Sequence, residues 1–341
     1  MTKENFRRVA IGILAYSRPY SLVLTLESIV SLNASNTNTF LLQNGMDDGE
    51  FNKVVKAYPW VVAIRSPENL GAAGGRNHLI NLLLKEDFEY LFLVDGDIIL
   101  APDSLERLLR VYPELVNPGL VSCLVRAHEQ PERIFLSGIG FNWFSLEYLV
   151  HTDLPSVPVI ERQAVGTGAV LISSCVLRRA PRLDDRFFLD LEDNDWCMQM
   201  SILGYKHYVV RDAVAYHPDI GGKHLQPLLV YYRARNHMLL LKKLGIPLTQ
   251  PKVLRLVLGE VKHRLRRIFA LTPLSITALV FAILAYFHVI IRRWGKAPGW
   301  MYKSPERFLE YRFNRLIFQP RIVCAVKAVL NGSAVRGSRK T

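Results

Sequence analysis

Two acidic side chains, Asp95 and Asp97, follow an apolar run and are separated only by Gly96. The run, residues 90–94, is typical of a buried strand. Carboxylate oxygens spaced in this way can share one divalent cation, and a glycine between them lets a ligand come close to the backbone. Since ligands of open α/β sheets bind outside the carboxyl ends of the strands, a metal-bound phosphate would fit here. Asp-Gly-Asp is also common in surface turns.

A second acidic cluster, Glu192, Asp193 and Asp195, lies at or just before the start of a helix expected at residues 196–203. Acids at this position complement the helix dipole, which is one explanation of the cluster. The other is catalytic, because a carboxylate held beside a crevice can act as a general base and take a proton from an alcohol. His217 ends a later apolar run, and it is either structural or a further ligand of a metal site begun by the two aspartates.

The elements that must position these residues alternate between strand and helix. We expect strands at residues 9–15, 40–42, 61–65 and 90–94, and helices at residues 21–32, 51–58, 78–85 and 102–112. This alternation predicts a mostly parallel sheet flanked by helices, with the loops after the strands along one edge. A glycine-rich turn at residues 69–77 and the carboxylates would therefore share a crevice.

The glycine-rich turn does not match the common phosphate-binding loops. Gly71, Gly74 and Gly75 do not fit G-x-G-x-x-G, and no Gly-Lys-Ser/Thr follows them. The spacing argues against a Rossmann oxidoreductase and against a P-loop NTPase. Glycines here could simply serve a tight connection from strand to helix, but Arg76 and Asn77 at the helix start favour a nucleotide.

Length and charge set broad limits. With 341 residues the chain can form one catalytic domain and an appendage, and its net charge of +13 implies an anionic partner. Membrane surface, nucleic acid and nucleotide phosphates all satisfy the charge. The four cysteines show no Cys-x-x-Cys and no paired spacing, which favours a reducing compartment over a disulfide framework or a zinc site. Residues 1–8 are polar and lack the apolar stretch of a secretory signal, so we expect the catalytic part in the cytoplasm.

The carboxyl-terminal third reads as helical. Residues 225–244 form one expected helix, residues 252–267 a basic amphipathic one, and residues 268–291 contain no Asp, Glu, Lys or Arg. The last stretch has the roughly 20 residues that a membrane span needs, although Thr272, Pro273 and their neighbours weaken its first turns. Attachment to the membrane surface is the favoured interpretation, ahead of a buried core helix and of a true span. Residues 329–341 are small, polar and basic, which predicts a flexible tail.

An ordered set of short motifs carries a family resemblance. The motifs are Ala15-Tyr-Ser-Arg-Pro19, Gln43-Asn-Gly45, Asn69-Leu-Gly71, Gly74-Gly-Arg-Asn77, Asp95-Gly-Asp97, Thr167-Gly-Ala169, Phe187-Phe188 with Glu192-Asp-Asn-Asp195, Gly204-Tyr205, Tyr216-His-Pro218 and Tyr231-Tyr-Arg-Ala-Arg-Asn236. Over residues 9–244 the chain resembles the inverting glycosyltransferases of family 2 with the GT-A fold. It is most similar to the bacterial rhamnosyltransferase-like and galactofuranosyltransferase-like enzymes that extend cell-surface glycans.

The resemblance implies a role for each matching residue. It implies that the nucleotide-sugar donor is held by Ala15, Tyr16, Arg18, Gln43, Asn44, Asn69, Gly74, Arg76, Asp95, Gly96, Thr167 and Gly168, and that Asp95, Asp97 and His217 bind Mn²⁺ or Mg²⁺. Asp193 matches the family's catalytic base, while Glu192 and Asp195 would orient the acceptor or the base. The resemblance implies a UDP- or dTDP-linked donor. Gln43 departs from the family pattern, because many members carry at this position an aspartate that binds the pyrimidine base, so the choice between the two nucleotides stays open.

The same resemblance gives an expected organisation and set of partners. Residues 1–224 would be the catalytic domain, with a nucleotide-sugar half at 1–118 and an acceptor half at 119–224, and residues 225–328 would associate with an anionic membrane surface. The implied activity is inverting transfer of a hexosyl or deoxyhexosyl group to a hydroxyl of a polyprenyl-diphosphate-linked glycan. The expected place is the cytoplasmic face of the inner membrane, as a peripheral protein.

Two other functions fit parts of the sequence. A nucleotidyltransferase acting on sugar phosphates would need a loop rich in Lys or Arg near the first strand, where only Arg18 is available. A basic nucleic-acid-binding protein would interleave its positive charge with stacking aromatics, whereas here the charge is spread over the carboxyl-terminal helices. We therefore expect no nucleic acid partner.

Overall fold

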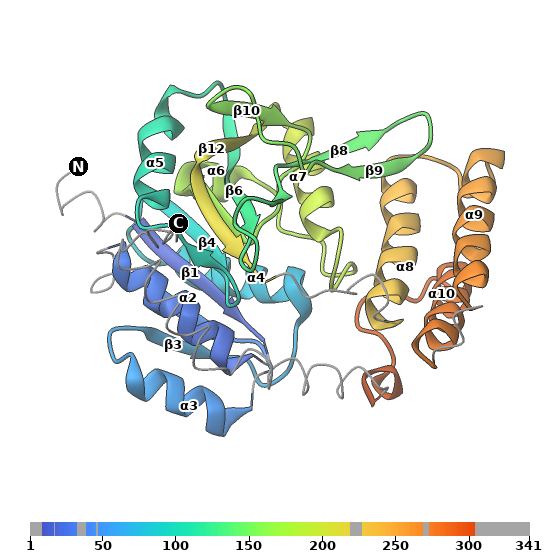
Figure 1. Ribbon diagram of the computed structural model, residues 1–341, viewed down its shortest axis with the longest axis horizontal. Coiled ribbons are helices and arrows are strands. Elements are labelled where there is room, and N and C mark those ends of the chain that lie inside the picture. The colour runs from blue at the N-terminus through green and yellow to red at the C-terminus, as the bar shows by residue number, and fades with distance from the viewer. Residues whose placement is uncertain are drawn as a thin grey trace, which may run out of the picture.

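A mixed sheet of ten strands forms the centre of the molecule, with helices on both of its faces (Figure 1). The computed structural model describes residues 9–16, 18–32, 39–45, 47–218, 227–268 and 273–303. The main path of the sheet runs in the order β10-β12-β6-β11-β4-β1-β2-β3, while β5 pairs with β12 and β7 with β6.

The first half is the parallel β/α unit that the alternating pattern predicts. Its elements are β1 (Val9–Ala15), α2 (Pro19–Ser31), β2 (Thr39–Gln43), α3 (Asp48–Ala57), β3 (Val62–Arg65), α4 (Gly71–Leu83) and β4 (Tyr90–Asp95). β1 pairs in parallel with both β2 and β4, and β3 pairs in parallel with β2. The register places Leu14 of β1 opposite Asp95 of β4, so the two strands end together and open the expected crevice.

The second half makes the sheet mixed. Its elements are β5 (Ile99–Leu100), α5 (Ser104–Val111), the 3-10 helix η1 (Tyr112–Glu114), β6 (Pro118–Ala127), β7 (Ile134–Leu136), β8 (Ile139–Asn142), β9 (Glu147–Val150), β10 (Val159–Arg162), β11 (Ala169–Ser173), α6 (Ser174–Arg179), α7 (Glu192–Ile202) and β12 (Lys206–His217). β11 runs antiparallel between β4 and β6, β12 is parallel to β6, and β8 and β9 form a separate hairpin. The expected fold, a mostly parallel sheet flanked by helices, is confirmed.

The central strands are buried on both faces, which explains their continuous apolar runs. Phe92 and Val94 of β4 pack with Leu22 of α2 on one face, and Leu91 and Leu93 pack with α4 on the other. Alternate side chains of one strand thus reach two separate cores.

Two predicted boundaries are wrong, both beside the site. The segment at residues 69–77 is not a turn throughout, because α4 begins at Gly71 and carries Gly74, Gly75 and Arg76 on its first turns. A Cβ on Gly75 would lie 2.7 Å from Leu14 Cδ1, so this glycine lets the helix approach β1. α7 likewise begins at Glu192 rather than at residue 196, which puts the acidic cluster within its first turn.

Three helices and a short 3-10 helix follow the sheet: α8 (Pro227–Lys243), α9 (Pro251–Ile268), α10 (Pro273–Ile290) and η3 (Gly299–Lys303) (Figure 1). α10 packs on α8, with Phe281 and Ala285 buried against Tyr231 and Tyr232. The opposite side of α10 is apolar and exposed at Val280, Ile283, Phe287 and Ile290.

Membrane crossing was one of the interpretations open for residues 268–291. Within the residues that the structure describes, no helix combines the length and the apolar character that crossing a bilayer requires. The predicted tail at residues 329–341 lies outside the described residues, as does the end of the predicted helical region after residue 303.

Candidate active site

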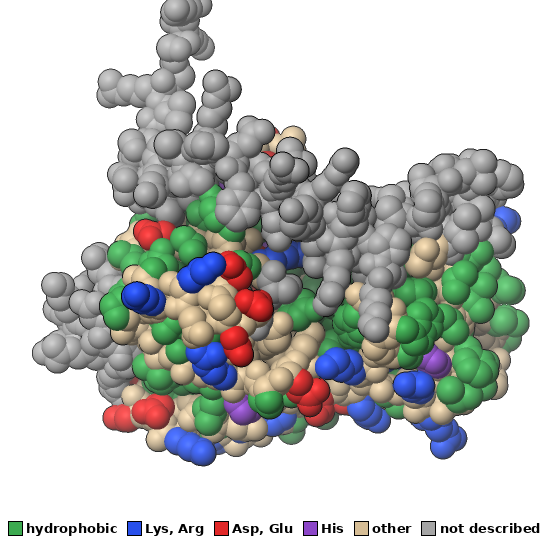
Figure 2. All heavy atoms as spheres, turned by 90° about the horizontal axis from the view of Figure 1, so that it is seen from below, with side chains coloured by type: hydrophobic (Ala, Val, Ile, Leu, Met, Phe, Trp, Pro, Cys, Tyr) green, Lys and Arg blue, Asp and Glu red, His purple; other side chains and the backbone are tan. Residues whose placement is uncertain are grey.

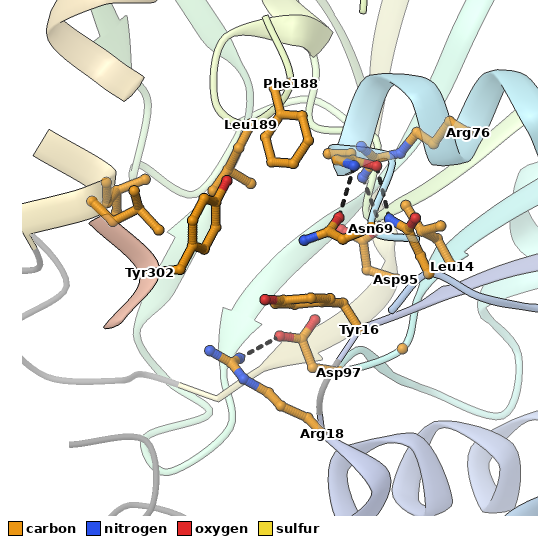
Figure 3. Close-up of a pocket in the computed structure, with 16 residues that line it drawn as sticks. Leu14, Tyr16, Arg18, Asn69, Arg76, Asp95, Asp97, Phe188, Leu189 and Tyr302 are labelled. Carbon is orange, nitrogen blue, oxygen red and sulfur yellow. Dashed lines mark hydrogen bonds and ion pairs between the residues drawn. The ribbon is translucent and has the colours of Figure 1, made fainter. Parts of the chain in front are cut away.

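A cavity of about 330 Å³ lies where β1 and β4 end (Figure 3). It is lined by Leu14, Tyr16, Arg18, Asn44, Asn69, Gly71, Ala72, Arg76, Asp95, Gly96, Asp97, Phe188, Leu189, Leu228, Leu229 and Tyr302. Eight of the predicted donor- and metal-binding residues thus come together: Tyr16, Arg18, Asn44, Asn69, Arg76, Asp95, Gly96 and Asp97. Basic, acidic and amide side chains share this lining with an exposed aromatic ring, that of Tyr16.

The Asp97 carboxylate lies between an arginine and a histidine. Arg18 Nη1 is 2.8 Å from Asp97 Oδ2, an ion pair drawn as a dashed line in Figure 3, and His217 Nε2 is 3.8 Å from the same oxygen. His217 Nδ1 is 2.7 Å from the Pro218 carbonyl oxygen, and when it donates to that oxygen Nε2 presents a lone pair towards Asp97. The His217 ring also stacks on Phe135, which fixes its orientation.

These side chains provide only some of the ligands that a divalent cation needs. Carboxylate oxygen and imidazole nitrogen are ligands that Mn²⁺ and Mg²⁺ accept, with phosphate oxygens completing the shell. Across the described ranges, no group of three acidic, histidine or cysteine side chains is gathered closely enough to hold a metal. Asp95 turns to Arg76, while Asp97 and His217 face each other. Two of the three predicted ligands are therefore assembled.

A buried arginine joins the end of β4 to the start of α7. Arg76 is only 4% exposed; its Nη2 lies 2.7 Å from Asp95 Oδ1 and its Nη1 lies 3.0 Å from Glu192 Oε1. Burial disfavours the charge of Arg76, but Asp95 and Glu192 outweigh burial and keep its pKa above the ordinary value. We call Asp95, Arg76 and Glu192 the carboxylate bridge.

The three acids of the α7 first turn have different surroundings. Asp195 is paired with Lys243 Nζ at 2.7 Å, and Glu192 belongs to the carboxylate bridge. Asp193 accepts from the Asn194 backbone N–H and forms no ion pair within the described part of the chain. Burial raises the pKa of Asp193, with Arg76 opposing this and Asp190 adding to it. Burial and the charge of Asp193 also raise the pKa of Glu192.

The two asparagines of the cavity hold the loop that starts α4. Asn44 Nδ2 donates to the Gly71 carbonyl, Asn44 Oδ1 accepts from the Leu70 N–H, and Asn69 Oδ1 accepts from the Gly71 N–H, all at 2.8 Å. Gln43 is buried and donates to Asp48 Oδ1 instead of lining the cavity. The predicted contact of Gln43 with the base stays a prediction.

The other predicted residues do not line the cavity. These are Ala15, Gly74, Thr167, Gly168, Glu192, Asp193, Asp195 and His217. Gly168 accepts from the Asp95 N–H at 2.9 Å, and a Cβ at Gly168 would lie 3.2 Å from Asp95 Oδ2. Gly168 therefore lies directly against Asp95.

The other eight lining residues were not predicted as site residues: Leu14, Gly71, Ala72, Phe188, Leu189, Leu228, Leu229 and Tyr302. Phe188 belongs to a motif that was noted, but no role was attached to it. Leu228, Leu229 and Tyr302 come from beyond the expected domain boundary at residue 224, where the sequence offers no signal for the site. Residues from both sides of that boundary thus line one cavity.

Comparisons with known proteins address the family of the chain. The model of the family described as "Glycosyltransferase like family 2" matches residues 7–225, more than half of the chain. A dTDP-rhamnosyl transferase, RfbF, of Shigella flexneri is 23% identical over 190 residues, which are 53% of this chain and 62% of that relative's length.

Similarity to solved structures concerns the fold. A crystal structure of GalNAc-T7 with UDP, GalNAc and Mn²⁺ matches with a TM-score of 0.55 and 12% identity, over 69% of this chain and 47% of the other. A mannosyltransferase from Pyrobaculum calidifontis in complex with GDP-Man and Mn²⁺ matches with a TM-score of 0.48 and 14% identity, over 95% of this chain and 85% of the other. On the family match and the observed sheet, the chain belongs to glycosyltransferase family 2 and has the GT-A fold.

Proposed function

We propose that the protein transfers a sugar from a nucleoside-diphosphate donor to an acceptor hydroxyl, with inversion at the anomeric carbon and with Asp193 as the base. The carboxylate bridge is the observation that carries this proposal. It connects Asp95, which lines the cavity at the end of β4, with the turn that holds Asp193. A donor site and a base are thereby fixed relative to each other by one buried guanidinium.

The cavity provides for the donor. The exposed ring of Tyr16 offers a stacking surface for a nucleotide base, and Arg18 lies beside it as a cation for the phosphates (Figure 3). When bound by Asp97 and His217, Mn²⁺ or Mg²⁺ would neutralise the charge that develops on the leaving diphosphate. Release of Arg18 from Asp97 would then free its guanidinium for a phosphate oxygen.

Asp193 suits the role of base better than its two neighbours do. Glu192 is held by Arg76 and Asp195 by Lys243, so proton transfer at either would disturb an ion pair. The raised pKa of Asp193 brings its proton affinity closer to working pH, which favours general-base catalysis. A single base opposite the leaving group gives inversion, whereas retention through a covalent intermediate would need a positioned nucleophile.

A dTDP- or UDP-linked donor is the proposed substrate class. The RfbF relative supports dTDP, while Gln43, with its amide directed at Asp48, leaves the base preference open. The test is thermal unfolding of the purified protein with dTDP-, UDP- and GDP-sugars, with and without Mn²⁺. We expect one donor to raise the unfolding temperature by several degrees only with Mn²⁺, since ligand at about 100 times its dissociation constant stabilises by about 2.7 kcal/mol.

Asp97→Ala is the matched variant in this test. It should unfold near the wild-type temperature without ligand and lose the Mn²⁺-dependent shift. An equal shift in the Asp97→Ala protein would contradict the proposed metal-diphosphate site.

A lipid-linked glycan is the proposed acceptor, and the proposed place is the cytoplasmic face of the inner membrane. Hydrophobic side chains gather over the carboxyl-terminal helices, with Lys and Arg side chains beside them, at the right of Figure 2. On α10 the exposed apolar stripe, Val280, Ile283, Phe287 and Ile290, is followed by the exposed Arg292 and Arg293. Apolar side chains bordered by basic ones suit an anionic bilayer surface.

Vesicle flotation tests the attachment. The full chain should float with vesicles that contain phosphatidylglycerol and stay behind with pure phosphatidylcholine. Phe287→Ser should weaken this binding about tenfold, since burial of one large apolar side chain contributes roughly 1.5–3 kcal/mol. Val62→Ser, at an equally exposed valine of β3, is the control and should bind as wild type. Equal loss in both variants, or no loss in either, would contradict the proposed surface.

A further inference from the structure

The loop that leads into α7 has an unfavourable backbone. Phe188, Asp190 and Leu191 have φ angles of 62°, 70° and 66°, in the left-handed region that side chains with a Cβ rarely adopt. Three such residues within four positions do not persist unless the surrounding structure holds them. The loop ends at Leu191, two residues before Asp193 in the first turn of α7, so whatever holds this backbone also sets the position of that carboxylate.

A single buried amide reaches three carbonyls of the loop. Asn236 of α8 is fully buried, and its Nδ2 donates to the carbonyl oxygens of Phe187, Leu189 and Asp190 at 2.8, 2.7 and 2.7 Å. These contacts span two of the left-handed residues, Phe188 and Asp190, and end next to the third, Leu191. Because an amide is planar and has two N–H groups, it can bind all three oxygens only while they converge.

Arg235 completes this contact from the neighbouring position. Its Nη2 donates to the carbonyls of Arg186 and Phe187 at 3.1 and 3.2 Å, and its Nε donates to Asn236 Oδ1 at 3.1 Å. The guanidinium lies over the rings of Tyr231 and Tyr232, with its Cζ 5.2 and 5.0 Å from their centroids. Arg235 thus holds the loop and also fixes which way the Asn236 amide points.

The clamped loop contacts the donor side as well. The Phe188 carbonyl accepts from the Ala72 N–H of α4 at 2.6 Å, and Phe188 and Leu189 line the cavity. In addition, Arg235 Nη1 donates to the Gly295 carbonyl at 2.6 Å, beyond the end of α10. The two α8 side chains therefore connect the carboxyl-terminal helices to both parts of the site.

We propose that Arg235 and Asn236 are positioning residues that hold residues 186–191 in their left-handed conformation and so place Asp193 beside the donor. This role rests on the proposed function of Asp193 as the base. It also gives a function to the Tyr231-Tyr-Arg-Ala-Arg-Asn236 motif, whose side chains contact the loop from outside the residues that the family match covers.

Hydrogen–deuterium exchange of the full chain tests the clamp without a substrate. In Asn236→Ala the amides of residues 187–195 should exchange at least about tenfold faster than in wild type, because the loop loses its support. Met238→Ala is the control, since Met238 is equally buried on α8 but packs under the β8–β9 hairpin with Phe141 and Leu146. Equal acceleration of residues 187–195 in both variants, or none in Asn236→Ala, would overturn the clamp.

Catalysis provides the second readout. With the donor chosen from the thermal panel and water as acceptor, Asn236→Ala should release nucleoside diphosphate about 10²-fold more slowly, a loss much larger than any loss of its Mn²⁺-dependent donor affinity. Arg235→Lys keeps the charge but loses the planar set of N–H donors. Its rate should therefore lie between the rates of wild type and Asn236→Ala. A rate equal to that of Met238→Ala, or a parallel loss of donor affinity, would overturn the positioning role.

The two proposals fail separately. Near-normal turnover in Asp193→Asn would overturn the base assignment, and with it the positioning role, without altering the exchange result. Normal exchange in Asn236→Ala beside an inactive Asp193→Asn would overturn the clamp alone.

Discussion

The donor side and the base side of the site are built in different ways. On the donor side, parallel strands end at the same edge, and short loops from β1 and β4 bring Arg18, Asp95 and Asp97 together. On the base side, Asp193 follows a loop with an unfavourable backbone that depends on side chains more than 40 residues later in the chain, such as Asn236 to Asp190. The topology of the parallel strands brings the donor-side residues together, whereas the base side depends on hydrogen bonds from α8.

Breaking the carboxylate bridge should have the largest effect on stability, because it joins the two sides. Arg76→Met leaves Asp95 and Glu192 without their buried counter-charge and should lower the free energy of unfolding by about 3–5 kcal/mol. Urea denaturation measures this change. Arg110→Met, which removes an exposed pair with Glu106, is the control and should lose no more than about 1 kcal/mol.

Equal free energies of unfolding for Arg76→Met and Arg110→Met would contradict the claim that the carboxylate bridge joins the donor side to the base side.

The contact between α4 and the loop before α7 provides a second test of how the donor side is joined to the base side. Gly71 has a φ of 75°, and a Cβ there would lie 2.3 Å from the Phe188 carbonyl oxygen. Gly71→Ala should therefore destabilise the protein by about 1–3 kcal/mol more than Gly204→Ala does. Gly204 has a similar φ of 87° but nothing within 4 Å of its Cβ position, so the difference isolates the clash. Equal melting temperatures for the two variants would show that the loop moves away without cost.

The pH dependence of activity and of donor binding should differ between the base side and the donor side. Since the pKa of Asp193 is raised, its carboxylate should gain a proton, and activity should fall, at a pH above the roughly 3.9 of an ordinary aspartate. The rate of donor consumption at low substrate concentration, followed from pH 7 downwards, gives the pH at which activity falls on the acid side. Mn²⁺-dependent donor binding should keep its affinity over the same range. Activity that stays constant down to about pH 5 would contradict a base in these surroundings.

The sequence predicted the donor side of the site better than the base side. The strand at residues 9–15 and the crevice beside Asp95 and Asp97 were predictable, because apolar runs and parallel topology depend on nearby residues. The first turns of α4 and α7 were missed, since Gly, Asp and Asn are weak helix formers on their own and packing decides their state. Leu228 and Tyr302 could not be predicted as cavity residues, because tertiary packing brings them to the cavity and no local sequence pattern marks them.

The most direct test of the base assignment is turnover measured beside donor binding in Asp193→Asn. This change keeps the shape of the side chain and removes its ability to accept the proton. With the base at Asp193, turnover falls at least about 10²-fold while Mn²⁺-dependent donor binding stays close to wild type. Near-normal turnover in this variant would contradict the proposed mechanism.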